Sequence, residues 1–248
     1  MLVETQAIVL RTQRFGDTSI VATLYTQQFG KCAVLAKGAR TPGSAQGVAL
    51  EVPNHIRVAF YRKPRREVFL VRFAETVERF HQIRTSMERM ATALFVVESI
   101  LLTQELEEPN PVLYALLLQA LRGTEQSSSF SVSIAIAFLL RLARLLGFAI
   151  PIDRDTAWNS QQTYVLHPQD GAFKIATRHD NGGIFFSGSE IALLSTLSHL
   201  PLEAASSVEV PPSSSLSLLR RLIAYLEHHL ERRLVFRSLE LWTVGSEI

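Results

Sequence analysis

Cysteine is almost absent from this 248-residue chain, since Cys32 is the only one. One thiol excludes an internal disulfide and any metal site built from several thiolates. It also fits a reducing compartment, where free thiols persist. Cys32 lies in an apolar stretch, so its simplest role is that of a small side chain in a packed strand.

The sequence also lacks the short motifs of common enzymes. It has neither a glycine-rich phosphate loop nor a G-x-S-x-G nucleophile turn, and its seven histidines show no H-E-x-x-H spacing. The neighbouring carboxylates Glu107 and Glu108 are predicted to lie in a loop with no partner. We therefore expect a protein that is not an enzyme and that uses no metal and no cofactor.

Long apolar runs are missing as well. The longest, around Ile134–Leu140, is stopped by Arg141 and Arg144, whereas a membrane-spanning helix needs about 20 apolar residues. The first residues show no charged segment followed by an apolar run, which a secretion signal would need. These patterns predict a cytoplasmic protein that does not bind membranes.

The positive charge is concentrated in the amino-terminal part. Residues 1–75 contain 11 Lys and Arg against 5 Asp and Glu, a net charge of +6, whereas the other 173 residues contain 14 against 18, a net charge of −4. A basic segment of this kind favours contact with a polyanion such as nucleic acid.

Residues 4–75 alternate between apolar and polar with a period of two, which is typical of half-buried strands. We expect strands at Gln6–Gln13, Ser19–Thr26, Lys31–Ala36, Ile56–Tyr61 and Val68–Ala74. Five short strands with one longer connection after the third predict a closed OB-type barrel at residues 1–76. An SH3-like barrel fits the same periodicity.

Cations gather at the predicted strand ends. Lys31, Lys37 and Arg40 are expected on one rim of the barrel, with Gly30 supplying the positive φ of a tight turn. Neutralising phosphates would confer affinity without sequence specificity. The candidate nucleic-acid-binding residues are Arg11, Arg14, Lys31, Lys37, Arg40, Arg62, Lys63, Arg65 and Arg66. A solvated charged loop is the alternative for the dense turn at 62–66.

Aromatic residues of the predicted barrel provide candidates for base stacking. Most are expected in the core, and one or two on the surface as stacking platforms. The candidates are Phe15, Tyr25, Phe29, Phe60, Tyr61 and Phe69.

From about Thr76 the apolar period changes to 3.6, which predicts a mainly helical domain at residues 77–248. We expect a helix after a capping box at Thr85–Glu88, then helices at Val112–Leu121, Ser133–Leu146 and Leu216–Leu230. Gly123–Ser129 is predicted to be a polar loop. Ser187–Glu190 reads as a second capping box, opening a helix through His199. Turn residues at Gln169–Gly171 predict a β-hairpin within a β-rich insert at about 152–187. The whole is an α+β chain.

Several sequence blocks occur together in an order known from one family. The amino-terminal blocks are Ala7–Thr12, Gly16–Ser19, Thr26–Lys31 and Ala36–Arg40, and weaker ones follow at Val97–Ile100, Asn110–Leu117, Arg144–Phe148 and Leu226–Ser238. Over nearly the whole chain they resemble the RecO recombination-mediator family. The A-K-G-A-R block at 36–40 is the most specific of them.

The resemblance implies DNA repair without enzymatic activity. Proteins of this family bind single- and double-stranded DNA, anneal complementary strands, and act with RecR to help the RecA recombinase displace single-strand-binding protein, whose C-terminal tail is a further expected contact. Many members carry a four-cysteine zinc module, where this chain has Asp155–Trp158 and Phe173–Arg178. It therefore resembles the zinc-free branch. The alternative is a protein–protein adaptor whose basic barrel binds an acidic partner.

Overall fold

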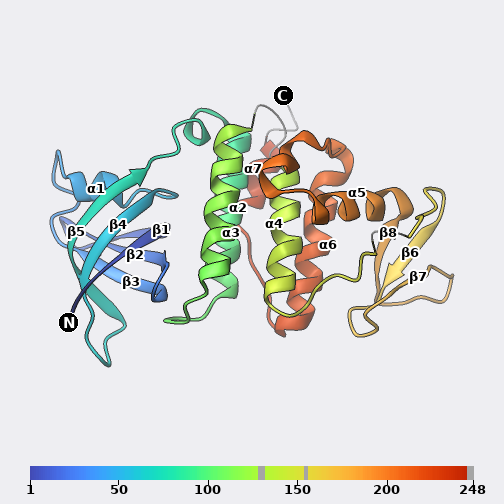
Figure 1. The fold of residues 1–248 in the computed structure, drawn as a ribbon, viewed down its shortest axis with the longest axis horizontal. Helices are drawn as coiled ribbons and strands as arrows, with labels where there is room; N and C mark the ends of the chain where they lie inside the picture. The colour runs from blue at the N-terminus through green and yellow to red at the C-terminus, as the bar shows by residue number, and fades with distance from the viewer. Residues whose placement is uncertain (128–131, 154–155, 245–248) are drawn as a thin grey trace.

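The computed structural model describes residues 1–127, 132–153 and 156–244. Its amino-terminal part is a closed five-stranded barrel. Its strands are β1 (Leu2–Phe15), β2 (Ser19–Thr26), β3 (Gly30–Ala36), β4 (His55–Tyr61) and β5 (Val68–Glu78). They close in the order β1-β2-β3-β5-β4, with β3 and β5 parallel. A short helix, α1 (Ala45–Ala49), lies between β3 and β4 (Figure 1). The closed five-stranded barrel confirms the predicted OB type rather than the SH3-like alternative.

Two barrel strands are longer than the alternation predicted. β1 begins at Leu2 instead of Gln6, because Val3 and Thr5 continue the buried positions of the strand. One half of β1 pairs with β4 and the other half with β2, and a register irregularity between Val9 and Arg11 lies at the change. β5 continues to Glu78, beyond the expected end at Ala74.

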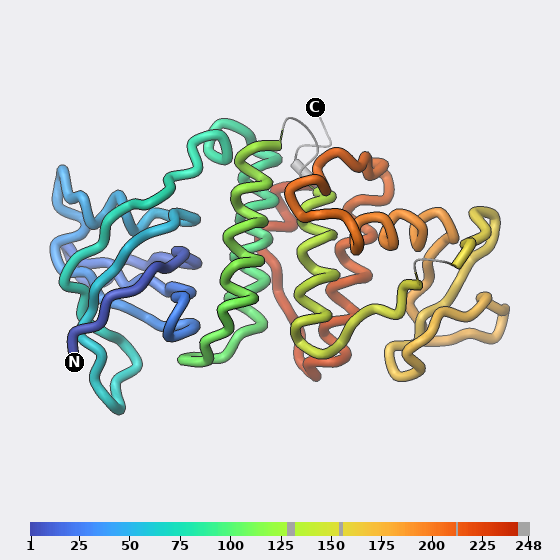
Figure 2. Tube along the Cα trace, in the orientation of Figure 1, coloured from blue at the N-terminus to red at the C-terminus, as the bar shows by residue number. Residues whose placement is uncertain are grey.

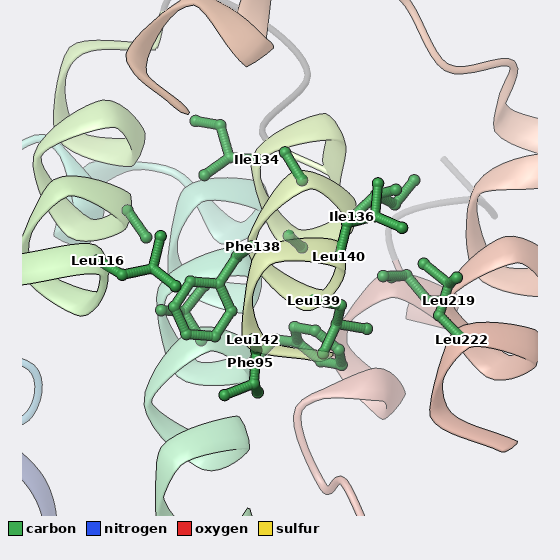
Figure 3. Close-up of a cluster of buried hydrophobic side chains, with 14 of the residues drawn as sticks. Phe95, Leu116, Ile134, Ile136, Phe138, Leu139, Leu140, Leu142, Leu219 and Leu222 are labelled. Atoms are coloured by element: carbon green, nitrogen blue, oxygen red, sulfur yellow. The ribbon is translucent and has the colours of Figure 1, made fainter. Parts of the chain in front are cut away.

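The helical part is built around α4. The helices are η1 (Ile83–Thr85), α2 (Met87–Thr103), α3 (Pro111–Gln126), α4 (Val132–Leu145), α5 (Gly188–His199), η2 (Leu202–Ser207), α6 (Pro212–Leu230) and α7 (Leu239–Val244). Eleven residues of α4 are buried, including Ile136, Phe138 and Leu142. Figure 3 shows these side chains between Phe95 and Leu116 on one side and Leu219 and Leu222 on the other. Burial on all sides explains why this helix is apolar over most of its surface.

Two local predictions in the helical part are wrong. The cap of α2 is Ser86 rather than Thr85, and its side chain accepts a hydrogen bond from the Arg89 backbone N–H. Gly123 lies within α3 rather than in a loop, and an added Cβ there would make only ordinary contact with the Glu203 backbone, at 3.5 Å. The capping box at Ser187, which opens α5, is confirmed.

The predicted β-rich insert is a three-stranded sheet. β6 (Thr163–Leu166) lies between β7 (Phe173–Ile175) and β8 (Ile184–Ser187), which confirms the hairpin. Trp158 packs edge-on against Tyr164 and Phe173, with ring centroids 5.1 and 5.5 Å apart. Asp155, at the position of the missing first cysteine pair, lies outside the described residues. No group of three or more His, Cys, Asp or Glu in the described residues could hold a metal ion.

The barrel and the helices share a hydrophobic core. Ile8, Leu10 and Tyr25 of the barrel belong to the same buried cluster as α2, α3 and α4, whereas most of the barrel interior forms a second cluster. The traces in Figures 1 and 2 show α2 and α3 between the barrel and the remaining helices, with the small sheet at the far end. Within the described ranges, no helix is both long enough and apolar enough to cross a membrane.

Candidate nucleic-acid interface

An apolar row crosses the outer surface of all five barrel strands. Leu2, Tyr61 and Leu70 lie opposite one another on β1, β4 and β5, and Leu35 of β3 and Val21 of β2 continue the row. Their side chains point outward, because the alternate positions of β3 and β5, such as Val34 and Val71, fill the interior. Leu2, Tyr61 and Leu70 are between 36% and 48% exposed. A row of this kind offers bases an apolar surface.

Cations flank the apolar row on both sides. Lys37 and Arg72 each lie two positions beyond the paired residues Leu35 and Leu70, so their side chains leave the same outer face. Both are exposed, and Arg72 lies within 3.4 Å of the Tyr61 hydroxyl. On the other side, the exposed Arg11 is paired with Thr23 of β2. We call this surface the basic face; its outward residues are Arg11, Val21, Leu35, Lys37, Leu70 and Arg72.

One end of the basic face carries further predicted residues. Arg14 pairs with Ile20, which in turn pairs with Ala36 at the end of β3. The Arg40 backbone N–H donates to the Thr18 carbonyl at 2.8 Å, and the Arg40 guanidinium donates to the Gly16 carbonyl at 3.1 Å. Lys37 and Arg40, which were expected on one rim, thus lie near Arg14 around the turn between β1 and β2.

The adjoining outer surface of β1, β4 and β5 is electrically balanced. Arg57 of β4 forms ion pairs with Glu4 of β1 at 3.7 Å and with Glu75 of β5 at 2.6 Å. The row from Leu2 to Val21, by contrast, contains no carboxylate. In the described residues, Arg11, Lys37 and Arg72 therefore have no carboxylate paired with them, whereas the neighbouring Arg57 has two.

Lys31 does not belong to the basic face. β3 runs from Gly30 to Ala36, so Lys31 and Lys37 lie at opposite ends of one strand, about 20 Å apart at the usual rise per residue. The Lys31 ammonium donates to the Leu101 carbonyl at 2.9 Å, at the junction with α2. Burial lowers the pKa of Lys31, partly offset by Glu105. The prediction of a shared rim was wrong, because packing against α2 covers this end of the strand.

The Arg62–Arg66 turn between β4 and β5 lies at the Lys31 end of the barrel. The first cation of the turn, Arg62, forms an ion pair with Glu107. Its guanidinium carbon also lies 5.4 Å from the centroid of the Phe29 ring. Lys63, Arg65 and Arg66 are exposed. Glu107 therefore has a partner, contrary to the sequence-based expectation, because the loop between α2 and α3 crosses the barrel here.

The candidate stacking residues include both buried and exposed aromatic side chains. Tyr25, Phe60 and Phe69 are core residues, at most 3% exposed, and Phe29 lies half-buried beneath Arg62. Phe15 and Tyr61 remain exposed, one beside Arg14 and the other in the apolar row. Two stacking candidates on the surface agree with the expectation.

Arg72 was missed at the sequence level. It belongs to the same strand as Val68 and Leu70, and a period of two from those residues places it on the outer face. The signal was present in the alternation, but the pairing of β5 beside β3 was needed to bring Arg72 to Lys37.

Two family models together cover most of the chain. The model described as "Recombination protein O N terminal" matches residues 1–80, and the one described as "Recombination protein O C terminal" matches residues 84–238. The chain belongs to the RecO family. The RecO resemblance noted from the sequence blocks is thereby confirmed.

Curated RecO proteins resemble this chain along its length. "DNA repair protein RecO" of Chlorobium limicola is 29% identical over 247 residues, covering 93% of this chain and 94% of that protein. The protein of the same name from Chloroherpeton thalassium is 28% identical, covering 98% of each. That of Salinibacter ruber is 35% identical over 153 residues, covering 62% of this chain and 59% of that protein.

Proposed function

We propose that this RecO-family protein is a DNA-binding and strand-annealing recombination mediator, without enzymatic activity, and that the basic face holds the DNA. The observation that carries the proposal is the segregation of charge on the barrel. Lys37, Arg72 and Arg11, none of which forms an ion pair in the described residues, flank a row of exposed apolar residues, while the carboxylates beside the row, Glu4 and Glu75, are paired with Arg57. Lys37, Arg72 and Arg11 would neutralise phosphates, with Arg14 and Arg40 extending the path at one end.

The apolar row favours a single strand on this face. Unpaired bases have exposed π-faces, which Tyr61, Leu70 and Leu35 would contact while the phosphates lie toward the flanking cations. A duplex turns its bases inward, so it would use only the cations. Double-stranded DNA should therefore bind through the cations alone. Its affinity should fall more steeply with salt than the affinity for single-stranded DNA.

The family membership supports a proposal for the cellular role. Acting in the cytoplasm, the protein would help load the RecA recombinase on single-stranded DNA coated by single-strand-binding protein during gap repair. RecR and the C-terminal tail of single-strand-binding protein are its proposed partners, and RecA is an indirect one. Holding one strand by its backbone would leave base edges free for a complementary strand, which would allow annealing.

The test removes two cations from the basic face. The Lys37→Ala, Arg72→Ala variant should fold normally, because both side chains are exposed and no carboxylate in the described residues pairs with either. It should bind a single-stranded oligonucleotide about tenfold more weakly at moderate salt, with a salt slope flatter by about 1.4 for two lost phosphate contacts. Fluorescence anisotropy over a salt series measures both quantities.

A matched control removes the same charge from two cations that are ion-paired. In the Arg57→Ala, Arg79→Ala variant both lost cations are exposed and have carboxylate partners, Glu75 and Glu51. This variant should bind within about twofold of the wild type, since it removes no phosphate contact. Equal losses in the two variants would mean that only net charge matters, and the basic face would lose its assignment.

An adaptor for an acidic protein partner is the second candidate function. A groove of about 560 Å³ lies between β1, α2 and the carboxyl-terminal segment, with apolar walls that include Leu10, Leu94 and Leu241 and with Arg11 and Arg237 also lining it. Such a groove suits an apolar segment of an acidic protein. Salt separates the candidates: DNA affinity falls over decades as salt rises, whereas an apolar protein interface is little affected.

A further inference from the structure

A carboxylate occupies the most basic turn of the barrel. Glu107, in the loop between α2 and α3, forms an ion pair with Arg62 at the start of the Arg62–Arg66 turn. The Arg62 guanidinium is also held from one side by the Phe29 ring. Its planar donors therefore face an anion supplied by the protein itself.

The backbone of the loop fixes Glu107 at this position. The Glu107 N–H donates to the Lys31 carbonyl at 2.8 Å, so that the loop adds a short parallel bridge to the edge of β3. The neighbouring Glu108 approaches Gly30 so closely that a Cβ on the glycine would lie 2.2 Å from the Glu108 carbonyl oxygen. The position of the carboxylate thus depends on main-chain contacts and not on its ion pair.

The rest of the turn is open to an anion. Within the described part of the chain, no carboxylate forms an ion pair with Lys63, Arg65 or Arg66, and all three are exposed. Two hollows flank the turn: one of about 330 Å³ lined by Arg62, Lys63 and Arg65, and one of about 290 Å³ lined by Arg65 and Arg66. Glu107 lines both hollows, so this carboxylate lies between them.

The backbone at the tip supports a role for these cations. Arg65 has a φ of 63°, in the left-handed region where glycine is usual and other side chains are strained. Strained positions of this kind are concentrated at ligand-binding sites, where the side chain is needed in spite of its cost.

We propose that Glu107 occupies the place of a nucleic-acid phosphate, and that a strand reaches the Arg62–Arg66 turn by displacing this carboxylate. The ligand group is a phosphodiester, which Arg62 would bind through the guanidinium that now donates to the carboxylate. The exchange is feasible because Arg62 and Glu107 are each 40% exposed, and ion pairs at such exposure add little stability. A phosphate bound at the turn would also be attracted by Lys63, Arg65 and Arg66, with which Glu107 forms no ion pair.

Displacement of Glu107 would connect DNA binding to the helices. The same loop carries Glu105, which pairs with Arg232 at 3.0 Å after the end of α6. A strand on the turn therefore competes with a segment that joins α2 to α3 and contacts the carboxyl-terminal part. This inference rests on the proposed function but assigns a second DNA contact at the opposite end of β3 from Lys37.

The test compares two glutamates of the same loop. Glu107→Gln removes the competing charge at the turn, whereas Glu105→Gln removes an equal charge that pairs with Arg232 instead. Both variants should keep the wild-type melting temperature, since the Glu107 backbone bond to Lys31 remains. Glu107→Gln should bind single-stranded DNA about threefold to tenfold more tightly, with a salt slope steeper by about 0.7 for one more phosphate contact. Glu105→Gln should stay within about twofold of the wild type.

A second variant identifies the cation that gains the phosphate. In the Arg62→Ala, Glu107→Gln double variant, the added affinity of Glu107→Gln should disappear. An unchanged or weaker affinity of Glu107→Gln, or an equal gain in Glu105→Gln, would overturn the proposal. The Lys37→Ala, Arg72→Ala variant keeps this result separate from the proposed function: if it weakens binding while Glu107→Gln gains no affinity, the basic face stands and the Glu107 exchange is wrong.

Discussion

Gly30 shows how one residue serves two purposes in this barrel. Its φ of +65° closes the turn between β2 and β3, as the sequence predicted. The sequence did not predict the second purpose, the approach of the Glu108 backbone to within 2.2 Å of an added Cβ. A turn glycine can be recognised from its neighbours, but a contact with a residue 78 positions away depends on how the helices dock.

Replacing Gly30 should therefore cost more than replacing Gly38. Gly38 also has a positive φ, +69°, but nothing lies within 4 Å of an added Cβ there. Gly38→Ala should lower the free energy of unfolding by about 1–3 kcal/mol, the usual cost of a strained backbone. Gly30→Ala must in addition displace the Glu107–Glu108 segment, so its loss should be larger. Urea unfolding of both variants measures the difference, and equal losses would contradict the close approach.

At the scale of elements, a chain of hydrogen bonds joins β4, β5 and α3. The buried His55 lies 2.8 Å from the Glu78 carboxylate through Nδ1 and 3.0 Å from the Tyr114 hydroxyl through Nε2. Arg122 donates two bonds to Glu78, at 2.7 and 2.9 Å. A neutral imidazole satisfies both partners, donating to the carboxylate and accepting from the hydroxyl. Burial lowers the pKa of His55 despite the carboxylate.

This junction should make stability depend on pH. Because the folded protein lowers the pKa of His55, the unfolded chain binds the proton more readily, and stability rises with pH. The contribution is complete above about pH 6.5 and is lost as the pH falls from there toward the folded pKa. Hydrogen bonds from Arg122 lower the pKa of Glu78, whose contribution is lost only below about pH 4.3.

The urea midpoint should accordingly fall between pH 7.5 and pH 5.5, and His55→Gln should reduce that fall. His81→Gln is the control, since His81 is exposed in the segment after β5. It should keep the wild-type pH dependence. An identical pH dependence in His55→Gln and the wild type would remove His55 from this account.

The strands themselves were easier to predict from the sequence than the strands and helices that pack beside them. Alternation located all five barrel strands and the hairpin around Gly171, because side-chain period and turn chemistry are local properties. Pairing partners are not local. Lys31 and Lys37 looked alike in sequence, yet α2 covers one and leaves the other exposed. Arg72 was missed because only the parallel pairing of β3 with β5 brings it to Lys37.

At the scale of the whole molecule, the barrel is not independent of the helices. Leu10 is a barrel residue, but it lies in the large cluster formed with α2, α3 and α4, whereas Leu24 lies in the cluster of the barrel interior. Tyr25 stacks on Tyr114 of α3, with ring centroids 6.5 Å apart. Apolar contacts, the His55 junction and the Lys31 bond all cross the same boundary, so the two parts should unfold together.

Leu10→Ala and Leu24→Ala test this coupling from the two clusters. Both side chains are buried, at 4% and 0% exposure, so each truncation should cost about 2–5 kcal/mol. If the barrel and helices unfold as one unit, both variants should lower protection against hydrogen exchange equally in β3 and in α4, measured by mass spectrometry across a urea series. A barrel that opened alone would respond differently: Leu24→Ala would reduce protection in β3 and leave α4 unchanged. The shared cluster predicts the first outcome, because opening the barrel would expose Ile8, Leu10 and Tyr25 together with the α2 and α3 surface that covers them.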